Sequence, residues 1–151
     1  MKGRHLQFGA VALEFIMLFP FVVAMLYGAA VYGLTFFAQY RMQNAVDTAV
    51  ATALYLDRSA YEESEALSAA VTQRANTALA GLVAELPQSL RNLNTDAACS
   101  LEAVAGIEML RCQLVYNNYA ENPIAPALDF GMLGAFPPLP AQLDVNARAA
   151  F

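Results

Sequence analysis

One stretch decides the fold: residues 9–37, which read GAVALEFIMLFPFVVAMLYGAAVYGLTFF. From Phe15 to Phe37 this stretch contains no charged residue. A helix of that length covers roughly 35 Å at about 1.5 Å per residue, enough to cross an apolar layer of about 30 Å. Phe37 and Tyr40 lie at its far end, where aromatic side chains favour the lipid–water interface. The stretch therefore predicts a transmembrane helix over residues 10–38.

The alternative is a helix buried in a soluble core, which needs a domain large enough to surround it on all sides. The chain has 151 residues, of which 58% are hydrophobic and 14% charged. In soluble domains, about a quarter of the residues are charged. A chain of this size suits one membrane helix plus one small domain. We therefore expect a single domain over residues 39–151 after the span.

The distribution of charge predicts the orientation. Lys2, Arg4 and His5 precede the span, and the positive-inside rule keeps that end in the cytoplasm. From Gln39 onward there are six arginines, no lysine and twelve acidic residues. A surface of that sign disfavours nucleic acid and the anionic cytoplasmic leaflet as partners. We expect the domain outside the cytoplasmic membrane, where the oxidising compartment favours bridged cysteines.

The N-terminus differs from an ordinary secretory signal because an acid, Glu14, interrupts the apolar run near its start. An acidic residue in a membrane helix costs about 2.5–3.5 kcal/mol at the centre. Cleavage after Gly9 would make Glu14 the fifth mature residue, one turn from the new positive amine of Ala10. Cleavage after Gly3 would instead put Phe8 at that position. The alternative is an uncleaved signal anchor with Glu14 at the interface.

These features resemble a known family. A basic leader ending in Gly9, Glu14 at mature position five and an apolar helix behind it resemble the type IV prepilins. Glu14-Phe15, Pro20 and the run Phe21-Val-Val-Ala-Met-Leu look more specifically like TadE-like minor pilins (pseudopilins) of the tight-adherence, or Flp, pilus system. Ala10 at mature position one favours this branch, because ordinary type IV pilins begin with Phe.

The resemblance implies roles for individual residues. Residues 1–9 would be a prepilin leader, removed between Gly9 and Ala10 by a prepilin peptidase. Glu14 and Phe15 would belong to the motif for processing and subunit pairing. Pro20 would bend or loosen the helix for packing among subunits, although membrane helices also tolerate proline without such a role.

The resemblance also implies a function and a location. The chain would take part in assembly or initiation of an adhesive pilus, anchored by one span in the bacterial inner membrane with its C-terminal domain periplasmic. The implied partners are the prepilin peptidase, other major and minor pilins, the inner-membrane assembly platform and membrane lipid, with no nucleic acid. The alternative is an unprocessed, signal-anchored periplasmic domain that binds an unrelated partner.

Beyond the span, apolar residues recur mostly at three- and four-residue steps and predict two packed helices. The first continues from the membrane to about Leu56. The second opens at Ser59-Ala-Tyr-Glu62, which matches a capping box, and Pro87 closes it. Residues 88–98 are mostly polar and predict a loop.

The two cysteines predict a hairpin. If Ala105-Gly106 forms a two-residue turn, Cys99 lies opposite Cys112 in a non-hydrogen-bonded pair, with Cα atoms about 4.5 Å apart. A cross-strand disulfide fits that distance, although a bulge at this turn would shift the register. With the single histidine in the leader, metal binding or nucleophilic catalysis by these cysteines is not expected.

The C-terminal third contains five prolines between Asn117 and Pro140, which argue against regular structure there. Four apolar side chains in this segment would form a contact surface for another pilin or an assembly protein if they were exposed; they are Phe130, Met132, Leu133 and Phe136. The alternative, which we expect, is that the loop folds back over the sheet. Residues 142–148 alternate and predict a final strand. The predicted fold class is α+β and type IV pilin-like, with no enzyme constellation, cofactor or metal site.

Overall fold

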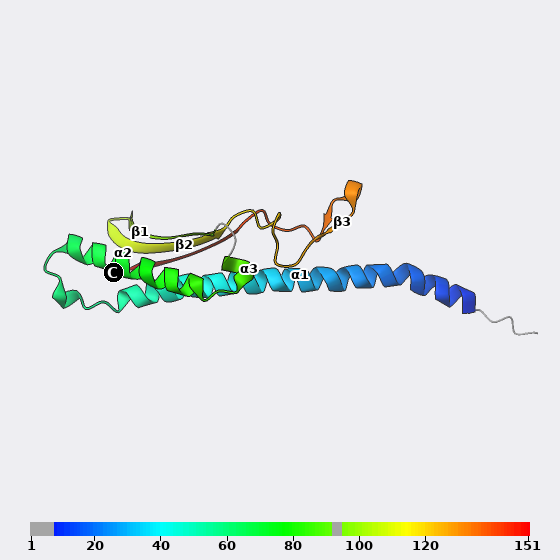
Figure 1. Cartoon of the computed structure of the whole chain (residues 1–151), viewed down its shortest axis with the longest axis horizontal. Helices are drawn as coiled ribbons and strands as arrows, with labels where there is room; N and C mark the ends of the chain where they lie inside the picture. The colour runs from blue at the N-terminus through cyan, green and yellow to red at the C-terminus, as the bar shows by residue number, and fades with distance from the viewer. Residues whose placement is uncertain (1–7, 92–94) are drawn as a thin grey trace, which may run out of the picture.

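A single long helix, α1 (Phe8–Leu54), sets the shape of the molecule. The computed structural model describes residues 8–91 and 95–151, without the side chains of residues 8–11 and Leu133. The other elements lie beside the C-terminal part of α1, and its N-terminal part extends beyond them (Figure 1). A long N-terminal apolar helix, a second helix and a small antiparallel sheet of three strands confirm the predicted α+β class.

The C-terminal half of α1 packs through one stripe. Its buried positions follow three- and four-residue steps, the spacing that places side chains on one helix face. The stripe begins at Gly28, so that one face of residues 28–38, within the predicted span, is covered by the rest of the chain. The helix ends at Leu54, close to the predicted end. The buried positions are Gly28, Val31, Thr35, Ala38, Met42, Ala45, Val46, Ala49, Val50 and Ala53.

The start of the second helix was predicted wrongly. A short 3-10 turn, η1 (Arg58–Ala60), comes first, and α2 (Ser64–Ala84) begins only afterwards. Asp57 Oδ1 accepts hydrogen bonds from the backbone N–H of Ser59 at 3.0 Å and from its hydroxyl at 2.7 Å. These bonds, the hydroxyl first, lower the pKa of the Asp57 carboxyl. Because Ser59 is held by Asp57, the capping box predicted with Glu62 does not open α2.

Residues 88–98 are also more ordered than predicted. The short helix α3 (Gln88–Arg91) follows Pro87, and strand β1 (Thr95–Val104) begins inside the predicted loop. Burial of Leu90, which is 2% exposed, ties α3 to the core. The guanidinium Nη1 of Arg91 donates to the carbonyl of Ala84 at 3.0 Å. An apolar anchor in a polar sequence thus creates a helical turn there.

The main sheet has the strand order β1-β2-β5, with β2 (Ile107–Tyr116) in the centre and β5 (Leu143–Ala150) at the other edge. Strands β1 and β2 pair antiparallel with Val104 opposite Ile107 and Cys99 opposite Cys112. Ala105 and Gly106 have φ values of 53° and 82°, and two-residue hairpin turns of the primed type require positive φ at both positions. No bulge shifts the register between these two strands.

The inner face of the sheet meets α1 and α2 to form the core. Leu110, Leu114 and Tyr116 of β2 are fully buried there. Burial raises the pKa of the Tyr116 hydroxyl, and the neighbouring Tyr119 raises it further. The outer face is polar and contains Glu102, whose carboxylate lies 3.9 Å from Arg111 and 3.5 Å from Arg148. One apolar and one polar face are what an antiparallel sheet covered on one side requires.

The proline-rich segment forms a small hairpin of its own, which the sequence did not predict. Strands β3 (Leu128–Asp129) and β4 (Ala135–Phe136) pair antiparallel around a 3-10 turn, η2 (Gly131–Leu133). The base of this hairpin lies beside α1, where Phe136 covers Gly28, and its tip projects away from α1, beyond the end of the main sheet (Figure 1). The expectation that the segment folds back over the sheet is therefore wrong for its tip.

Candidate membrane span and subunit-packing surface

The N-terminal part of α1 is an apolar helix with no cover from the rest of the described chain. All the side chains from Ala12 to Val23 are exposed. Among the described residues, one helix is long and apolar enough to cross a membrane, and it is this one. A water-exposed helix of that composition would be very unfavourable, since each large apolar side chain costs about 1.5–3 kcal/mol relative to burial. Lipid or neighbouring apolar helices are the surroundings that this surface fits.

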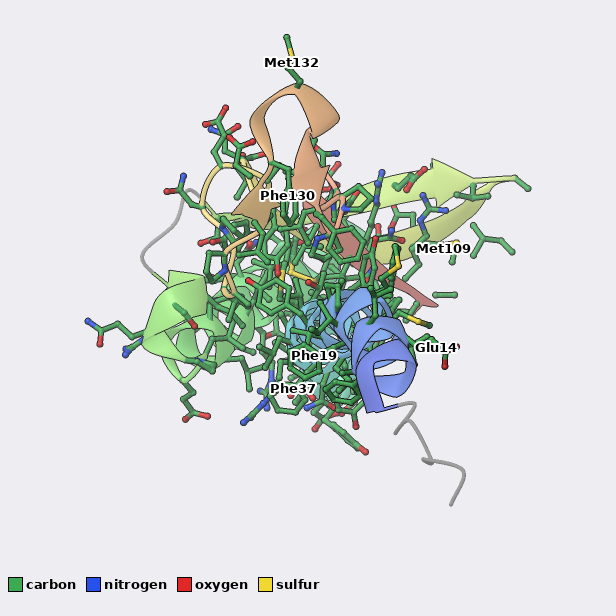
Figure 2. The ribbon with its side chains drawn as sticks, turned by 90° about the vertical axis from the view of Figure 1, so that its right-hand side faces the viewer. Glu14, Phe19, Phe37, Met109, Phe130 and Met132 are labelled. Carbon is green, nitrogen blue, oxygen red and sulfur yellow. A yellow bond between two sulfur atoms is a disulfide. The ribbon has the colours of Figure 1, made fainter. Side chains whose placement is uncertain are left out.

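The residues of the predicted cleavage and pairing motif lie at the start of this helix. The backbones of Gly9 and Ala10 are in the first turns of α1, and the Ala10 side chain lies outside the described residues, as do residues 1–7 of the predicted leader. Glu14 is exposed and points sideways from α1 (Figure 2). Phe15 packs against Phe19, with ring centroids 5.6 Å apart. The acid is thus presented outward, next to an aromatic pair.

Pro20 lies inside α1, and the helix is continuous through it. Its ring removes one backbone donor from the helix ladder, which weakens the helix at that turn. The helix bends gently in this N-terminal part (Figure 1). A role of Pro20 in packing among subunits stays a prediction.

Of the small residues near the middle of α1, one is buried within the chain and three are exposed. Gly28 is buried under the ring of Phe136, and a Cβ atom at Gly28 would lie 3.3 Å from the Cζ of that ring. Ala29, Ala30 and Gly33 are exposed. One small residue therefore serves a contact within the chain, while the other three leave a smooth strip on which another helix could lie closely.

Sequence reasoning missed the contacts that attach the proline-rich segment to α1. The hydroxyl of Tyr27 donates to the carbonyl of Pro126, and that of Tyr32 donates to the carbonyl of Pro138 at 3.0 Å. The buried hydroxyl of Thr35 lies 2.9 Å from the hydroxyl of Tyr119 and donates to the carbonyl of Val31 at 3.0 Å.

Thr35 is the residue from which the sequence could have indicated this contact. It is the one Ser, Thr, Asn or Gln side chain in the apolar run from Phe15 to Phe37. A hydroxyl at such a position needs a partner when it is buried. The partner, Tyr119, comes from a segment far along the chain, which local patterns do not reveal.

The disulfide lies at the other end of the molecule from the motif. Cys99 and Cys112 are bonded across β1 and β2, with Cα atoms 4.0 Å apart, in the register that their spacing predicts. Its formation in the cell stays a prediction. Thr95–Val104 is an edge strand, and in a non-hydrogen-bonded pair the backbone polar groups of Cys99 point away from β2. Those groups need other partners.

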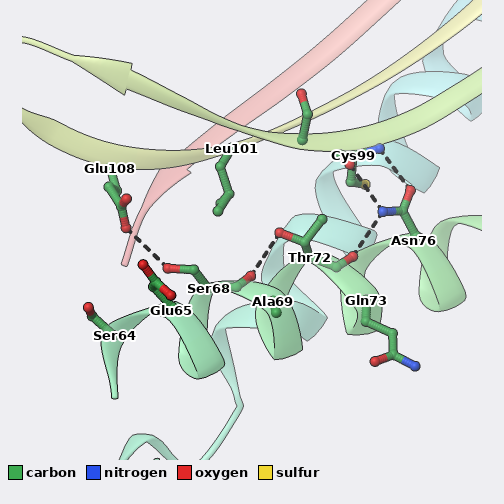
Figure 3. Close-up of a pocket in the computed structure, with 11 residues that line it drawn as sticks. Ser64, Glu65, Ser68, Ala69, Thr72, Gln73, Asn76, Cys99, Leu101 and Glu108 are labelled. Carbon is green, nitrogen blue, oxygen red and sulfur yellow. Dashed lines mark hydrogen bonds between the residues drawn. The ribbon is translucent and has the colours of Figure 1, made fainter.

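Asn76 of α2 provides those partners (Figure 3). Its Oδ1 accepts from the Cys99 N–H at 2.9 Å, and its Nδ2 donates to the Cys99 carbonyl at 3.0 Å. The same Nδ2 donates to the carbonyl of Thr72 at 3.0 Å. A shallow groove runs from this point along α2 and β1 to Ser68, whose hydroxyl donates to Glu108 at 3.1 Å. The side-chain amide thus pairs with the strand edge as a neighbouring strand would.

Within residues 8–91 and 95–151, no group of three or more His, Cys, Asp or Glu side chains could hold a metal ion. The groove is lined mainly by Ser, Thr, Ala and amide side chains. The side chains of Ser68, Thr72 and Asn76 are hydrogen-bonded within α2 or to the sheet, and this pattern fits a structural role.

The fold is that of an elongated α+β protein with one N-terminal apolar helix that is long enough to span a membrane. Residues 9–51 match the family model described as TadE-like protein. The match covers less than a third of the chain and confirms, over that part, the resemblance inferred from its residues. This is consistent with a TadE-like protein of the tight-adherence pilus system, a family that is membrane-associated and not a family of enzymes. No curated protein and no solved structure matches the chain.

Proposed function

We propose that the chain is a minor pilin or pseudopilin that takes part in assembly or initiation of a tight-adherence pilus. The observation that carries this proposal is the family match, which begins at Gly9, the residue after which cleavage is expected, and extends through the span to residue 51. The exposed apolar part of α1 supports it, because a pilin helix must first lie in lipid and then pack among other helices.

In this proposal a prepilin peptidase cuts between Gly9 and Ala10, which gives Ala10 a free amine. The mature helix then begins with a positive group near Glu14, whose exposed carboxylate is available to an amine of its own or of a neighbouring subunit. The N-terminus faces the cytoplasm, and residues 39–151 lie in the periplasm. Major and minor pilins and the inner-membrane assembly platform are the proposed partners.

Processing is tested by intact-mass analysis of the membrane-extracted protein from cells with and without an active prepilin peptidase. We expect a chain that begins at Ala10 only when the peptidase is active, and a full-length precursor from Gly9→Leu in both strains. The matched control is Gly3→Leu, which changes another leader glycine and should be processed normally. Retention of Met1 in the presence of the peptidase would favour the alternative, an unprocessed signal anchor.

Assembly is tested separately with Glu14→Gln. This variant should insert and be cut, because the scissile bond is unchanged, but its association with other pilins and the number of pili should fall. In a pilus, Glu14 would be paired with an amine, and its loss should weaken assembly. In a lone membrane anchor, Glu14 would be an unpaired carboxylate that is costly in lipid, and its loss should leave insertion unchanged or improve it. Normal pili after deletion of the whole chain would contradict the pilin function itself.

A further inference from the structure

The proline-rich hairpin carries an apolar tip that nothing in the described chain covers. We call residues 123–140 the apolar arm. Leu128 is 43% exposed, Phe130 54% and Met132 fully exposed. The arm contains one charged residue, Asp129, and its carboxylate accepts a hydrogen bond from the N–H of Gly131 at 2.8 Å. Exposed aromatic and aliphatic side chains grouped on one tip mark a surface for apolar contact.

The place of this arm along α1 indicates what it contacts. It is attached at Tyr27, Gly28 and Tyr32 through the contacts described above. N-terminal to this attachment, every described side chain from Ala12 to Val23 is exposed. The stretch from Ala10 to Tyr27 covers about 27 Å at 1.5 Å per residue, close to the roughly 30 Å thickness of a bilayer interior. Because one face of residues 28–38 is covered by the rest of the chain, we place the bilayer interior over residues 10–27 rather than over the whole predicted span of residues 10–38, and the arm then lies where the apolar layer ends.

Figure 2 views the molecule along α1 from its N-terminal end, so in this proposal the membrane plane is parallel to the page. Phe130 and Met132 extend sideways from α1 in that view, with Met132 at the outermost point (Figure 2). An amphipathic group that lies in the interface buries its apolar side chains about 5–10 Å into the boundary between head groups and acyl chains. The arm has the composition and the position for such a contact.

We propose that the apolar arm inserts Phe130 and Met132 into the outer surface of the bilayer that α1 spans. The inference rests on the proposed membrane anchoring and adds a second lipid contact beside the span. A single helix can tilt and rotate in a bilayer, whereas a helix with a lateral arm at the interface is held at one depth and one rotation. The arm thereby fixes the direction in which Glu14 and the strip of small residues face neighbouring helices.

The sequence contains no tryptophan, so a single introduced Trp reports its own surroundings. The full chain carrying Met132→Trp is placed in two sets of phosphatidylcholine nanodiscs at one chain per disc, with acyl chains brominated near the head group in one set and near the methyl end in the other. Phe19→Trp, within the span, is the positive control. Tyr55→Trp is the matched negative control, because Tyr55 is 84% exposed and lies at the far end of α1. Quenching of Trp emission by the brominated lipid is measured.

We expect Met132→Trp to be quenched mainly by lipid brominated near the head group and Phe19→Trp mainly by lipid brominated near the methyl end, each several-fold more strongly than Tyr55→Trp. Phe130→Trp should behave like Met132→Trp. Quenching as weak as that of Tyr55→Trp, with Phe19→Trp quenched, would overturn the arm's insertion and leave the span intact. Unquenched Phe19→Trp would overturn the span as well. A blue-shifted but unquenched Met132→Trp that appears only with two chains per disc would assign the tip to a second copy and overturn the proposal.

Discussion

Asn76 offers the sharpest test of how α2 holds the edge of the sheet. Asn76→Asp keeps the size of the side chain and the acceptor for the Cys99 N–H, but it replaces the donor of two hydrogen bonds, each 3.0 Å long, by a carboxylate oxygen. Each lost bond is worth about 1 kcal/mol, and the carboxylate then faces the two carbonyl oxygens of Thr72 and Cys99. We expect the free energy of unfolding to fall by about 2–3 kcal/mol.

The assay is thermal unfolding of the full chain in detergent, followed by near-ultraviolet circular dichroism of the tyrosines in the core. At about 4 °C per kcal/mol for a domain of this size, the midpoint of Asn76→Asp should fall by about 8–12 °C. The matched control is Thr77→Ala, the next residue of α2, which is exposed and whose hydroxyl bonds only to Gln73 of its own helix.

Acidification gives this test a second readout. Because the introduced carboxylate faces two carbonyl oxygens, its pKa in the folded chain should lie above the ordinary value of about 3.9, and its protonation restores one donor. The difference between Asn76→Asp and the parent chain should therefore shrink at low pH. A midpoint for Asn76→Asp within about 1 °C of that for Thr77→Ala would refute the argument that the amide completes the edge of β1.

Three further predictions follow from the core. Cys99 and Cys112 should react with a thiol reagent only after reduction, and free thiols in protein from the cell envelope would contradict the bridge. Thr35→Val should lower the free energy of unfolding by about 1–3 kcal/mol, since it leaves the buried Tyr119 hydroxyl without this partner; denaturant titration in detergent measures this. Because burial raises the pKa of Tyr116, its contribution to stability is present below the ordinary pKa of about 10 and is lost as pH rises through the folded pKa. Tyr116→Phe should therefore remove part of the alkaline loss of stability in thermal melts across that pH range.

The parts of the fold that local chemistry determines were predicted from the sequence. The cysteine spacing and the Ala105-Gly106 turn predicted the register of the hairpin, because in an antiparallel pair each step outward from the turn has one opposite residue. The periodic apolar positions predicted both long helices. The start of α2 was missed because Asp57, two residues earlier, binds the same Ser59 that the capping pattern requires.

The candidate site was predicted less completely. The motif around Gly9 and Glu14 could be found, because its residues lie within one short segment. The attachment of the apolar arm could not, because the hydroxyls of Tyr27 and Tyr32 bind carbonyls that lie 99 and 106 residues away. Backbone carbonyls carry no sequence signature, so the composition of the arm predicted a loop and left its location open.

Because α1 runs without a break from the exposed span into the core, the position and the rotation of the span are coupled to those of the domain. Each residue of an α-helix adds about 1.5 Å of length and 100° of rotation. Insertion of one alanine near Tyr27 would therefore turn the face that carries Glu14 by about 100° relative to the sheet, and four insertions would nearly restore it. Because the buried stripe from Gly28 onward fixes the domain to the same helix, a pull that draws the span out of lipid moves the sheet, the disulfide and the arm by the same distance.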